Sequence, residues 1–335
     1  MTPSGAAACL LAFVLGLAAV ALLGRVAQRL PQDAPNDRSL HIRPVPRAGG
    51  YAIWAGFVPA ALWFPPDVPG GALAWWPPWL AIAAISATDD ARGVSARVRL
   101  VVHLAASLWC AALMWRAISP SAAFASAEGL VAVALIALVL AWSANLYNFM
   151  DGNDGLAAAM TFVAFSAYGV GSLSRGDLAV PSFAIAAATL PFLVVNRPRA
   201  TMFLGDVGAV PLGFIAATFG IAGVADGRWP LWFPVLVFLP FIADATATLA
   251  RRIVRGDRLG ESHRDHYYQR LHRLGAGHGG TLTVYVALMA ATAGSATACL
   301  LFAPSLGPFA VGTAVVVCFI LFAAIDYHWR RKRSP

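Results

Sequence analysis

Five aspartates in three short blocks are the residues of this chain whose type and spacing could support chemistry. The blocks are Asp89 with Asp90, Asp151 with Asp154, and Asp206, and they hold five of the 16 acidic residues. Each block lies at the end of a long apolar run, and a carboxylate at the middle of a membrane span costs roughly 2.5–3.5 kcal/mol. Because five such groups need an offsetting interaction, they indicate a site for a divalent cation and a phosphate substrate.

The elements that must position these aspartates are transmembrane helices. The chain is 59% hydrophobic and 12% charged, its mean hydropathy is +0.69, and apolar runs near the span length of about 20 residues recur from end to end. An open sheet is excluded because lipid would leave its edge groups unpaired, and a β-barrel would need alternating polarity. We therefore expect one all-α, polytopic membrane domain over residues 1–335.

About eleven spans are predicted, with the N-terminus periplasmic and the C-terminus cytoplasmic. The candidate spans are residues 5–23, 50–64, 74–88, 99–116, 129–147, 155–173, 178–195, 208–225, 230–250, 280–302 and 307–327. The first run is predicted to be a retained span, because no Lys or Arg precedes Arg25 as a cleaved signal peptide would require.

Charge sets the predicted orientation. The gaps on one side of these spans carry 21 of the 24 Lys and Arg residues, and the opposite gaps carry Arg116, Arg175 and Arg228. The positive-inside rule places the basic side in the cytoplasm. All three aspartate blocks and a His-rich loop at 261–278 then lie at the cytoplasmic face, as expected for an active site that meets cytoplasmic substrates.

The adjacent carboxylates of Asp89 and Asp90 repel each other unless a cation or a proton lies between them. This favours a pair that binds a metal ion or handles a phosphate. The alternative is a solvated helix cap paired with Arg92, and the motif alone leaves both interpretations open.

Polar residues recur at every third position from Asn145 through Asn148 and Asp151 to Asp154. On one continuous α-helix this spacing places them along one slowly drifting side. Four amide and carboxylate groups would be costly facing lipid, so we predict that the stripe faces the protein interior or water. Local capping of a helix end is the less favoured alternative, because the repeat is too long for one cap.

Asp206 is flanked by Gly205 and Gly208, so a ligand could approach it closely. It is also well placed to be the N-cap of the helix that follows. The two roles are compatible.

Two basic loops could bind an anion. Around His263, Arg264 and His266, the Arg and His donors suit a phosphate or diphosphate, whereas two histidines without a third close ligand are weak evidence for zinc. A membrane-surface amphipathic loop is the alternative there. In the first loop Arg47 stands close to the paired glycines Gly49 and Gly50, which suits an anion, and simple positive-inside arginines explain that loop equally well.

Together these motifs resemble the polyprenyl-phosphate N-acetylhexosamine-1-phosphate transferase family (glycosyltransferase family 4). That family includes the phospho-MurNAc-pentapeptide translocase and the initiating transferases of O-antigen, teichoic acid and enterobacterial common antigen. The matching pieces run in the family's order over about residues 37–275. They are Asp89-Asp90-x-x-Gly93, Asn145-x-x-Asn148-Phe-Met-Asp151-Gly-x-Asp154-Gly155, Asn196 upstream of Phe203-Leu-Gly-Asp206-x-Gly208, Asp244-x-Thr246, and His263 with His266.

The resemblance implies a multi-pass enzyme of the bacterial inner membrane with its active site on the cytoplasmic face. Such an enzyme uses Mg²⁺, with Mn²⁺ as a substitute, to transfer a sugar-1-phosphate from a UDP-N-acetylhexosamine to undecaprenyl phosphate, and it releases UMP. No nucleic-acid partner is implied, and the oligomeric state stays open, a homodimer included.

The family's roles carry over to residues of this chain. Asp206 becomes the leading metal ligand together with Asp151, and Asp89 and Asp90 position or deprotonate the lipid phosphate. The resemblance also gives catalytic roles to Asp151, Asp154, His263 and His266, and substrate contacts to Asn145, Asn148, Asn196, Phe203, Arg47 and Arg264.

Within the family, the stretches around Asp151 and His266 look more like the O-antigen initiating branch. The peptidoglycan translocase, which carries adjacent histidines where this chain has His263 and His266, is the nearer alternative. An ion-coupled secondary transporter is a remote one, because transporter acids tend to lie near the bilayer midplane, often within repeats, and a scaffolding protein would not need clustered Asp and Asn. The donor sugar and the downstream polysaccharide stay open, and direct attack with Asp89 as the base is the preferred mechanism.

Overall fold

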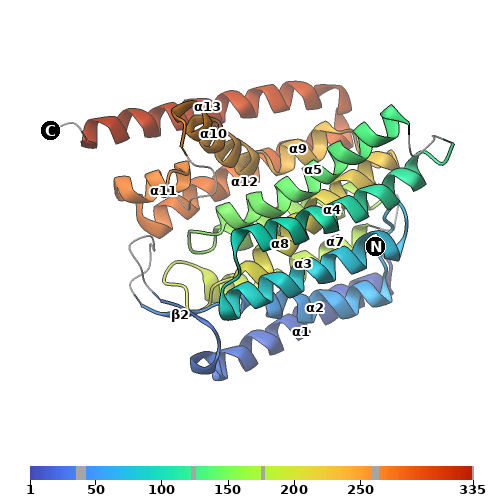
Figure 1. Cartoon of the computed structure of the whole chain (residues 1–335), viewed down its shortest axis with the longest axis horizontal. Helices are drawn as coiled ribbons and strands as arrows, with labels where there is room; N and C mark the ends of the chain where they lie inside the picture. The colour runs from blue at the N-terminus through green and yellow to red at the C-terminus, as the bar shows by residue number, and fades with distance from the viewer. Residues whose placement is uncertain (35–42, 122–125, 175–177, 258–263, 334–335) are drawn as a thin grey trace.

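The computed structural model describes residues 1–34, 43–121, 126–174, 178–257 and 264–333 as a bundle of helices that mostly run along one axis (Figure 1). The helices are α1 (Pro3–Arg25), α2 (Gly49–Trp63), α3 (Ala72–Arg92), α4 (Ala96–Ile118), α5 (Ala127–Met150), α6 (Leu156–Gly171), α7 (Ala179–Asn196), α8 (Asp206–Ala225), α9 (Trp232–Val237), α10 (Leu239–Arg255), α11 (Tyr267–Leu271), α12 (Gly277–Phe302) and α13 (Gly307–Arg333). Three further helical turns are η1 (Ala27–Arg29), η2 (His272–Ala276) and η3 (Pro304–Leu306), and the strands β1 (Gln32–Asp33) and β2 (Val45–Pro46) pair antiparallel.

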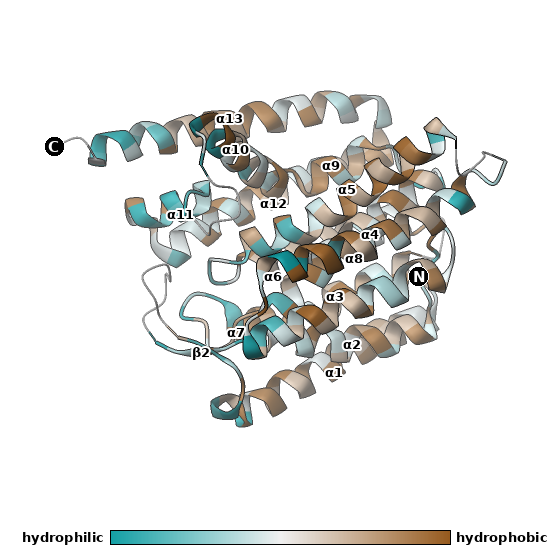
Figure 2. Ribbon diagram, viewed as in Figure 1, coloured by the Kyte–Doolittle hydropathy of each residue, from teal (hydrophilic) through white to brown (hydrophobic). Residues whose placement is uncertain are grey.

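The helices confirm an all-α membrane protein. By length and composition, seven stretches of the described residues could cross a membrane: Pro3–Arg25, Ala96–Ile118, Ala127–Met150, Ala179–Asn196, Asp206–Ala225, Tyr267–Phe302 and Pro304–Lys332. Hydrophobic residues fill the middle of the bundle, and hydrophilic residues gather at the end that holds β2, α11 and the C-terminus (Figure 2). The expected eleven spans and their orientation stay predictions.

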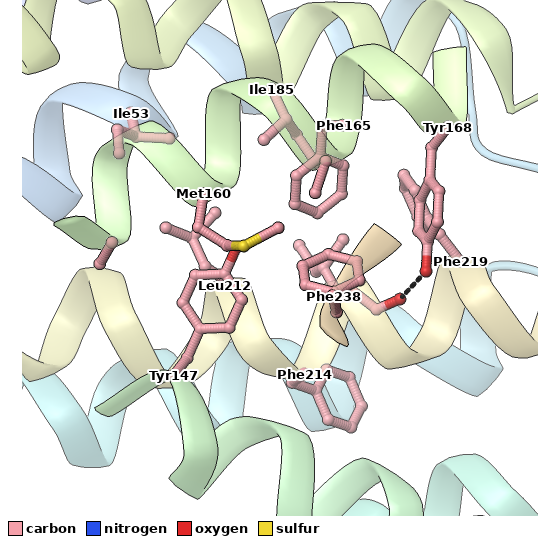
Figure 3. Packing of buried hydrophobic residues seen from close by; sticks show 14 of the residues in the cluster. Ile53, Tyr147, Met160, Phe165, Tyr168, Ile185, Leu212, Phe214, Phe219 and Phe238 are labelled. Carbon is pink, nitrogen blue, oxygen red and sulfur yellow. Dashed lines mark hydrogen bonds between the residues drawn. The ribbon is translucent and has the colours of Figure 1, made fainter. Parts of the chain in front are cut away.

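Helix α8 lies at the centre of the bundle and carries one arm of the site on its first turn. Most of its residues are buried, and aromatic and aliphatic side chains of neighbouring helices pack around it, including Tyr147, Phe165 and Tyr168 (Figure 3). It approaches α5 closely because Gly213 has no side chain: a Cβ there would lie 2.3 Å from the carbonyl oxygen of Ser143. The rigid packing of α8 fixes where its N-terminus points.

Two elements differ from the prediction. Residues 230–250, predicted as one span, form α9 and α10 with a break at Phe238, because Pro240 suits the first turn of a new helix and not the interior of a continuing one. The His-rich stretch 261–278, predicted as a loop, is helical from Tyr267 onward in its described part. A capping box starts α11 there, in which the side chain of Gln269 accepts the N–H of His266 at 3.3 Å.

Candidate active site

The carboxylate of Asp90, at the end of α3, caps the N-terminus of α8. Its two oxygens accept the backbone N–H groups of Asp206 at 3.1 Å and Val207 at 2.9 Å. Gly205 permits this approach, since its φ is +75° and a Cβ would lie 2.8 Å from the Asp90 carboxylate. Asp206 is therefore the first residue of α8 and not its N-cap as expected, because a carboxylate from another helix supplies the cap. This cap places two of the predicted aspartates side by side.

Arg99, one turn into α4, joins the other two carboxylates. Its Nη1 donates to Oδ2 of Asp206 at 2.9 Å and also to Oδ2 of Asp89. The second oxygen of Asp89 accepts the N–H of Val94 at 2.6 Å, in the turn that leads into α4. Asp89 and Asp90, adjacent in sequence, thus have different partners: Asp89 faces α4, and Asp90 faces α8.

Arg47 lies at the edge of this carboxylate cluster. Its guanidinium donates to Asp33 of β1 at 2.6 Å and lies 3.8 Å from Asp90. Burial lowers the pKa of Arg47, but the carboxylates of Asp33 and Asp90 outweigh this effect and leave that pKa above its ordinary value. A permanent positive charge therefore stands beside the cap of α8.

The paired glycines after Arg47 pack against the backbone and are not open to an anion. The N–H of Gly49 donates to the carbonyl of Phe203 at 2.8 Å, and that of Gly50 donates to the carbonyl of Leu204 at 2.9 Å. A Cβ on Gly50 would lie 2.4 Å from the backbone nitrogen of Gly208. The glycines therefore allow α2 to lie against the loop that carries Asp206, and Phe203 is placed by the same contacts.

The polar stripe of α5 ends earlier than predicted. Helix α5 stops at Met150, and Asp151 is its C-cap. Asn145, Asn148 and Asp151 line one cavity. The expectation that Asp154 continues the stripe is wrong, because the chain turns after Asp151 and no longer follows the helical repeat.

Asp154 instead holds the loop that follows α7. One carboxylate oxygen accepts the N–H groups of Arg199 at 3.0 Å and Ala200 at 3.2 Å. Its own N–H donates to Nδ1 of His278 at 3.2 Å. Arg199 has a φ of +72°, so these bonds stabilise a backbone conformation that a residue other than glycine rarely adopts.

Asn196 is committed to a similar bridge. It is buried at the end of α7, where its Oδ1 accepts the N–H of Gly155 at 3.0 Å and its Nδ2 donates to the carbonyl of Met202 at 2.9 Å. The side chain connects the loop before α6 to the loop before α8. Both loops carry predicted site residues, so the hydrogen bonds of Asn196 hold these residues in place from outside the site.

The imidazole of His266 is held by a fully buried carboxylate on α10. Oδ1 of Asp244 lies 3.1 Å from Nδ1 of His266 and accepts the N–H of Tyr267 at 2.9 Å. Oδ2 of Asp244 accepts the N–H of Tyr268 at 2.9 Å and the hydroxyl of Tyr285. The contact with Asp244 fixes the orientation of the imidazole ring. The sequence named Asp244 only as part of a motif, because the nearest of these partners, His266, lies 22 residues away.

Tyr268 ties this region to the end of α5. Its hydroxyl donates to the carbonyl of Phe149 at 3.0 Å. Gly152 makes the contact possible, since a Cβ there would lie 2.2 Å from that hydroxyl oxygen. The segment that carries His266 is thereby docked on the segment that carries Asp151.

A cavity of about 500 Å³ lies where α4, α5, α10 and the start of α11 meet. Its polar lining includes Arg99, His103, Asn145, Asn148, Asp151, Thr248, Arg252, His266 and Gln269, and its apolar lining includes Ala96, Leu100, Ala245 and Leu249. Two arginines, two histidines and a carboxylate facing one cavity suit a phosphorylated ligand and a cation.

The predicted residues thus fall into three sets. Asn145, Asn148, Asp151 and His266 line the cavity, Arg47, Asp89, Asp90 and Asp206 form the adjoining carboxylate cluster, and Asp154 and Asn196 bind loop backbone behind it. Arg99, which the sequence analysis did not name, lines the cavity and also binds Asp89 and Asp206 of the cluster, so it joins the first two sets. His263 lies outside the described residues. Arg264, half-buried two residues before His266, does not line the cavity.

Three basic cavity residues were missed by the sequence analysis: Arg99, His103 and Arg252. The two arginines were counted only as positive-inside charges, and His103 lies in an apolar run. The sequence feature that could have identified them is their polarity, because all three lie on α4 and α10 at positions that face the cavity. Nothing in the sequence separates such positions from those at the membrane surface.

The donor set suits a hard cation held partly by substrate. No three Asp, Glu, His or Cys side chains among the described residues are grouped closely enough to enclose a metal ion. Mg²⁺, however, is usually held by one or two carboxylates together with waters and substrate phosphates. Burial and the charges of Asp206 and Asp90 raise the pKa of Asp151 well above its ordinary value. Carboxylates this close to one another are stabilised by a cation, so the residues present fit Mg²⁺.

The chain is similar to known proteins of one transferase family. A model described as glycosyl transferase family 4 matches residues 73–224. The chain is 26% identical over 279 residues to a "probable undecaprenyl-phosphate N-acetylglucosaminyl 1-phosphate transferase" of Bacillus subtilis, covering 80% of this chain and 78% of that protein. It is 27% identical over 326 residues to a decaprenyl-phosphate N-acetylglucosaminephosphotransferase of Mycolicibacterium smegmatis (86% and 80% covered), and 28% identical over 270 residues to a phospho-N-acetylmuramoyl-pentapeptide-transferase of Thermosynechococcus vestitus (71% and 67% covered).

Proposed function

Because the chain belongs to glycosyl transferase family 4, the polyprenyl-phosphate N-acetylhexosamine-1-phosphate transferases, we propose that it transfers a HexNAc-1-phosphate from a UDP-sugar to undecaprenyl phosphate and releases UMP. The two relatives named for N-acetylglucosamine support UDP-N-acetylglucosamine as the first donor to test. Initiation of a lipid-linked O-antigen is the role we propose for the product.

One observation carries this proposal: Arg99 lies between a polar cavity and a cluster of carboxylates. The cavity offers Asn148, Asp151, His266 and Arg252 to a ligand, and Arg99 also binds Asp206 in the cluster. A diphosphate needs cationic donors, and a cation that bridges it needs carboxylates. Both are present within reach of one arginine.

The proposed reaction is a single phosphoryl transfer. An oxygen of the lipid phosphate attacks the β-phosphorus of the UDP-sugar, a new P–O bond forms, and the P–O bond to the UMP leaving group breaks. The C1–O bond of the sugar is untouched, so the anomeric configuration is retained. Catalysis of this kind rests on positioning and on charge stabilisation.

Each group of site residues has its own role in this reaction. Arg99, Arg252 and His266 hold phosphate oxygens, and Asn145 and Asn148 orient the donor. Asp89 receives the proton when the lipid phosphate enters protonated. Asp206 and Asp151 would hold Mg²⁺, which when bound neutralises charge on the phosphates. Arg47 and Asp90 keep the first turn of α8 in place.

The test is a membrane assay with undecaprenyl phosphate, Mg²⁺ and a panel of UDP-sugars, following UMP release. We expect UMP with at least one UDP-HexNAc, and none when the lipid phosphate is omitted. Membranes in which the protein is inserted but no UDP-HexNAc yields UMP would overturn the proposal.

The peptidoglycan translocase is the second candidate, because one of the relatives carries that name. It predicts UMP release with UDP-MurNAc-pentapeptide and little with the simple UDP-HexNAc donors. Including this donor in the same panel separates the two functions.

We also propose that the protein crosses the bacterial inner membrane about eleven times, with the site on the cytoplasmic face. The N- and C-termini lie at opposite ends of the bundle (Figure 1), and the hydrophilic end holds the C-terminus (Figure 2). A C-terminal green fluorescent protein should fluoresce, and a C-terminal alkaline phosphatase should be inactive. The reverse pattern would contradict this orientation.

A further inference from the structure

His103 is a buried polar side chain for which the described part of the chain provides no partner. It lies on α4, its relative exposure is 4%, and neither ring nitrogen has a hydrogen-bond partner among the described residues. Buried polar groups are nearly always paired, and an unpaired one in a native structure calls for an explanation. A ligand that enters the cavity would supply one.

The position of His103 indicates which ligand that is. It follows Arg99 by four residues, so it lies one turn further along the same face of α4. Like Arg99, it is part of the cavity wall. Since the χ2 torsion of histidine is broad, a modest turn of the ring can bring a nitrogen to the cavity.

The wall around His103 is amphiphilic. Leu100 of α4 and Ala245 and Leu249 of α10 give it an apolar surface, while Arg252 of α10 adds a cation. Helices α4 and α10 both pack against α5, whose Asn145 and Asn148 line the same cavity and remain for the donor. A phosphate that carries a hydrocarbon chain matches this combination better than a sugar nucleotide, which is polar over most of its surface.

We propose that this wall holds the phosphate of the lipid acceptor and that His103 donates a hydrogen bond to it. The neutral imidazole provides a donor without adding a third full positive charge beside Arg99 and Arg252. The inference rests on the proposed function, because it takes the acceptor to be a polyprenyl phosphate.

The kinetic test compares two substitutions of His103. His103→Leu removes the donor, and His103→Gln keeps an N–H of similar reach. In the leucine variant the KM for a polyprenyl phosphate should rise roughly tenfold or more, the size expected for one lost hydrogen bond to a charged group, while the KM for the UDP-sugar stays within twofold. The glutamine variant should recover most of the loss. An unchanged acceptor KM in His103→Leu, or a rise in the donor KM instead, would overturn the inference.

Ser107 offers a matched control. It lies four residues further along α4, is fully buried and has no hydrogen-bond partner for its hydroxyl among the described residues, yet it is not among the residues of the cavity wall. Ser107→Ala should leave both KM values unchanged. His103→Leu should also not lower the Tm of the ligand-free protein, because an apolar side chain replaces an unpaired polar one. A large fall in Tm would mean that His103 supports the fold instead.

A binding measurement keeps this inference separate from the proposed function. The Tm of the purified protein is recorded with a polyprenyl phosphate, with the corresponding polyprenol and with inorganic phosphate. The polyprenyl phosphate alone should raise the Tm, and His103→Leu should abolish most of that rise. If the wild-type protein releases no UMP but shows this His103-dependent shift, the proposed function fails and the phosphate site stands. If UMP is released and the shift does not depend on His103, the phosphate site fails alone.

Discussion

Asp244 and His266 form a buried carboxylate–imidazole pair whose members are 22 residues apart, with Asp244 Oδ1 3.1 Å from Nδ1 of His266. The same carboxylate accepts two backbone N–H groups and a tyrosine hydroxyl. One side chain on α10 thus fixes both the start of α11 and the face that its histidine presents. Asp244 therefore determines the orientation of the His266 ring together with the backbone at His266.

Asp244→Asn should therefore damage both stability and catalysis. The amide of Asn presents a donor to groups that are themselves donors, so at least one buried hydrogen bond is lost, at a cost of about 1–3 kcal/mol. Thermal unfolding of the purified protein measures the first effect, and UMP release at saturating substrates measures the second. Asp67→Asn, whose side chain is largely exposed at the other end of the bundle, is the control and should change neither.

A double-mutant cycle tests whether Asp244 acts through His266. If it does, the loss of kcat in Asp244→Asn combined with His266→Gln should be smaller than the product of the two single losses, because the second change removes an interaction already broken. Independent, multiplicative losses would show that Asp244 serves the fold alone.

Gly152→Ala should separate α5 from α11. A Cβ at this position would lie 2.2 Å from the hydroxyl oxygen of Tyr268, so the ring must move and its bond to the carbonyl of Phe149 must break. We expect a lower Tm and a lower kcat, and partial recovery of both when Tyr268→Phe removes the hydroxyl. Gly279→Ala is the matched control, because a Cβ there meets nothing within 4 Å. Equal effects at positions 152 and 279 would contradict the docking role of Gly152.

How far the sequence predicted the site depends on whether each residue's partners are close in sequence. The membrane helices and the aspartate blocks could be found because hydropathy and charge are local properties. The repeat was predicted to face the protein interior or water, and Asn145, Asn148 and Asp151 do line one cavity. Asp154 leaves the repeat, since the end of α5 follows from a turn that spacing does not show. Asp154 and Asn196 each bind backbone groups more than 40 residues away. In the sequence, Arg99 cannot be distinguished from the other positive-inside arginines, because its contacts form only when α3, α4 and α8 pack together.

Asp90 and Asp206 should respond differently to substitution, although both belong to the carboxylate cluster. Asp90→Ala removes the cap of α8 and should lower stability by about 0.5–2 kcal/mol, the usual value of an N-cap. Asp206→Ala removes one of several neighbouring negative charges, and Arg99 keeps Asp89 as its partner. It should leave the Tm nearly unchanged and lower kcat by roughly a hundredfold or more if Asp206 stabilises charge during the transfer.

Thermal unfolding and UMP release of the two variants, both purified from membranes, give this comparison. Asp89→Asn should resemble Asp206→Ala in losing activity while the protein still inserts. Near-wild-type turnover in Asp206→Ala or in Asp89→Asn would refute the role assigned to that residue.

Asp151 should make the stability of the protein depend on pH and on divalent cations. Its pKa is raised by burial and by the charges of Asp206 and Asp90, so the folded protein holds the proton more tightly than the unfolded chain does. The ionised group therefore lowers stability, and this cost appears as the pH rises above the ordinary aspartate pKa of about 3.9 and is complete above the raised value. Without divalent cations, Asp151→Asn should raise the Tm at neutral pH, and the gain should shrink as the pH falls toward about 4. Mg²⁺ should raise the Tm of the wild-type protein more than that of the variant, because the cation offsets a charge that Asn lacks. A Tm of Asp151→Asn that lies below the wild-type value at every pH would show that Asp151 is held by favourable contacts instead.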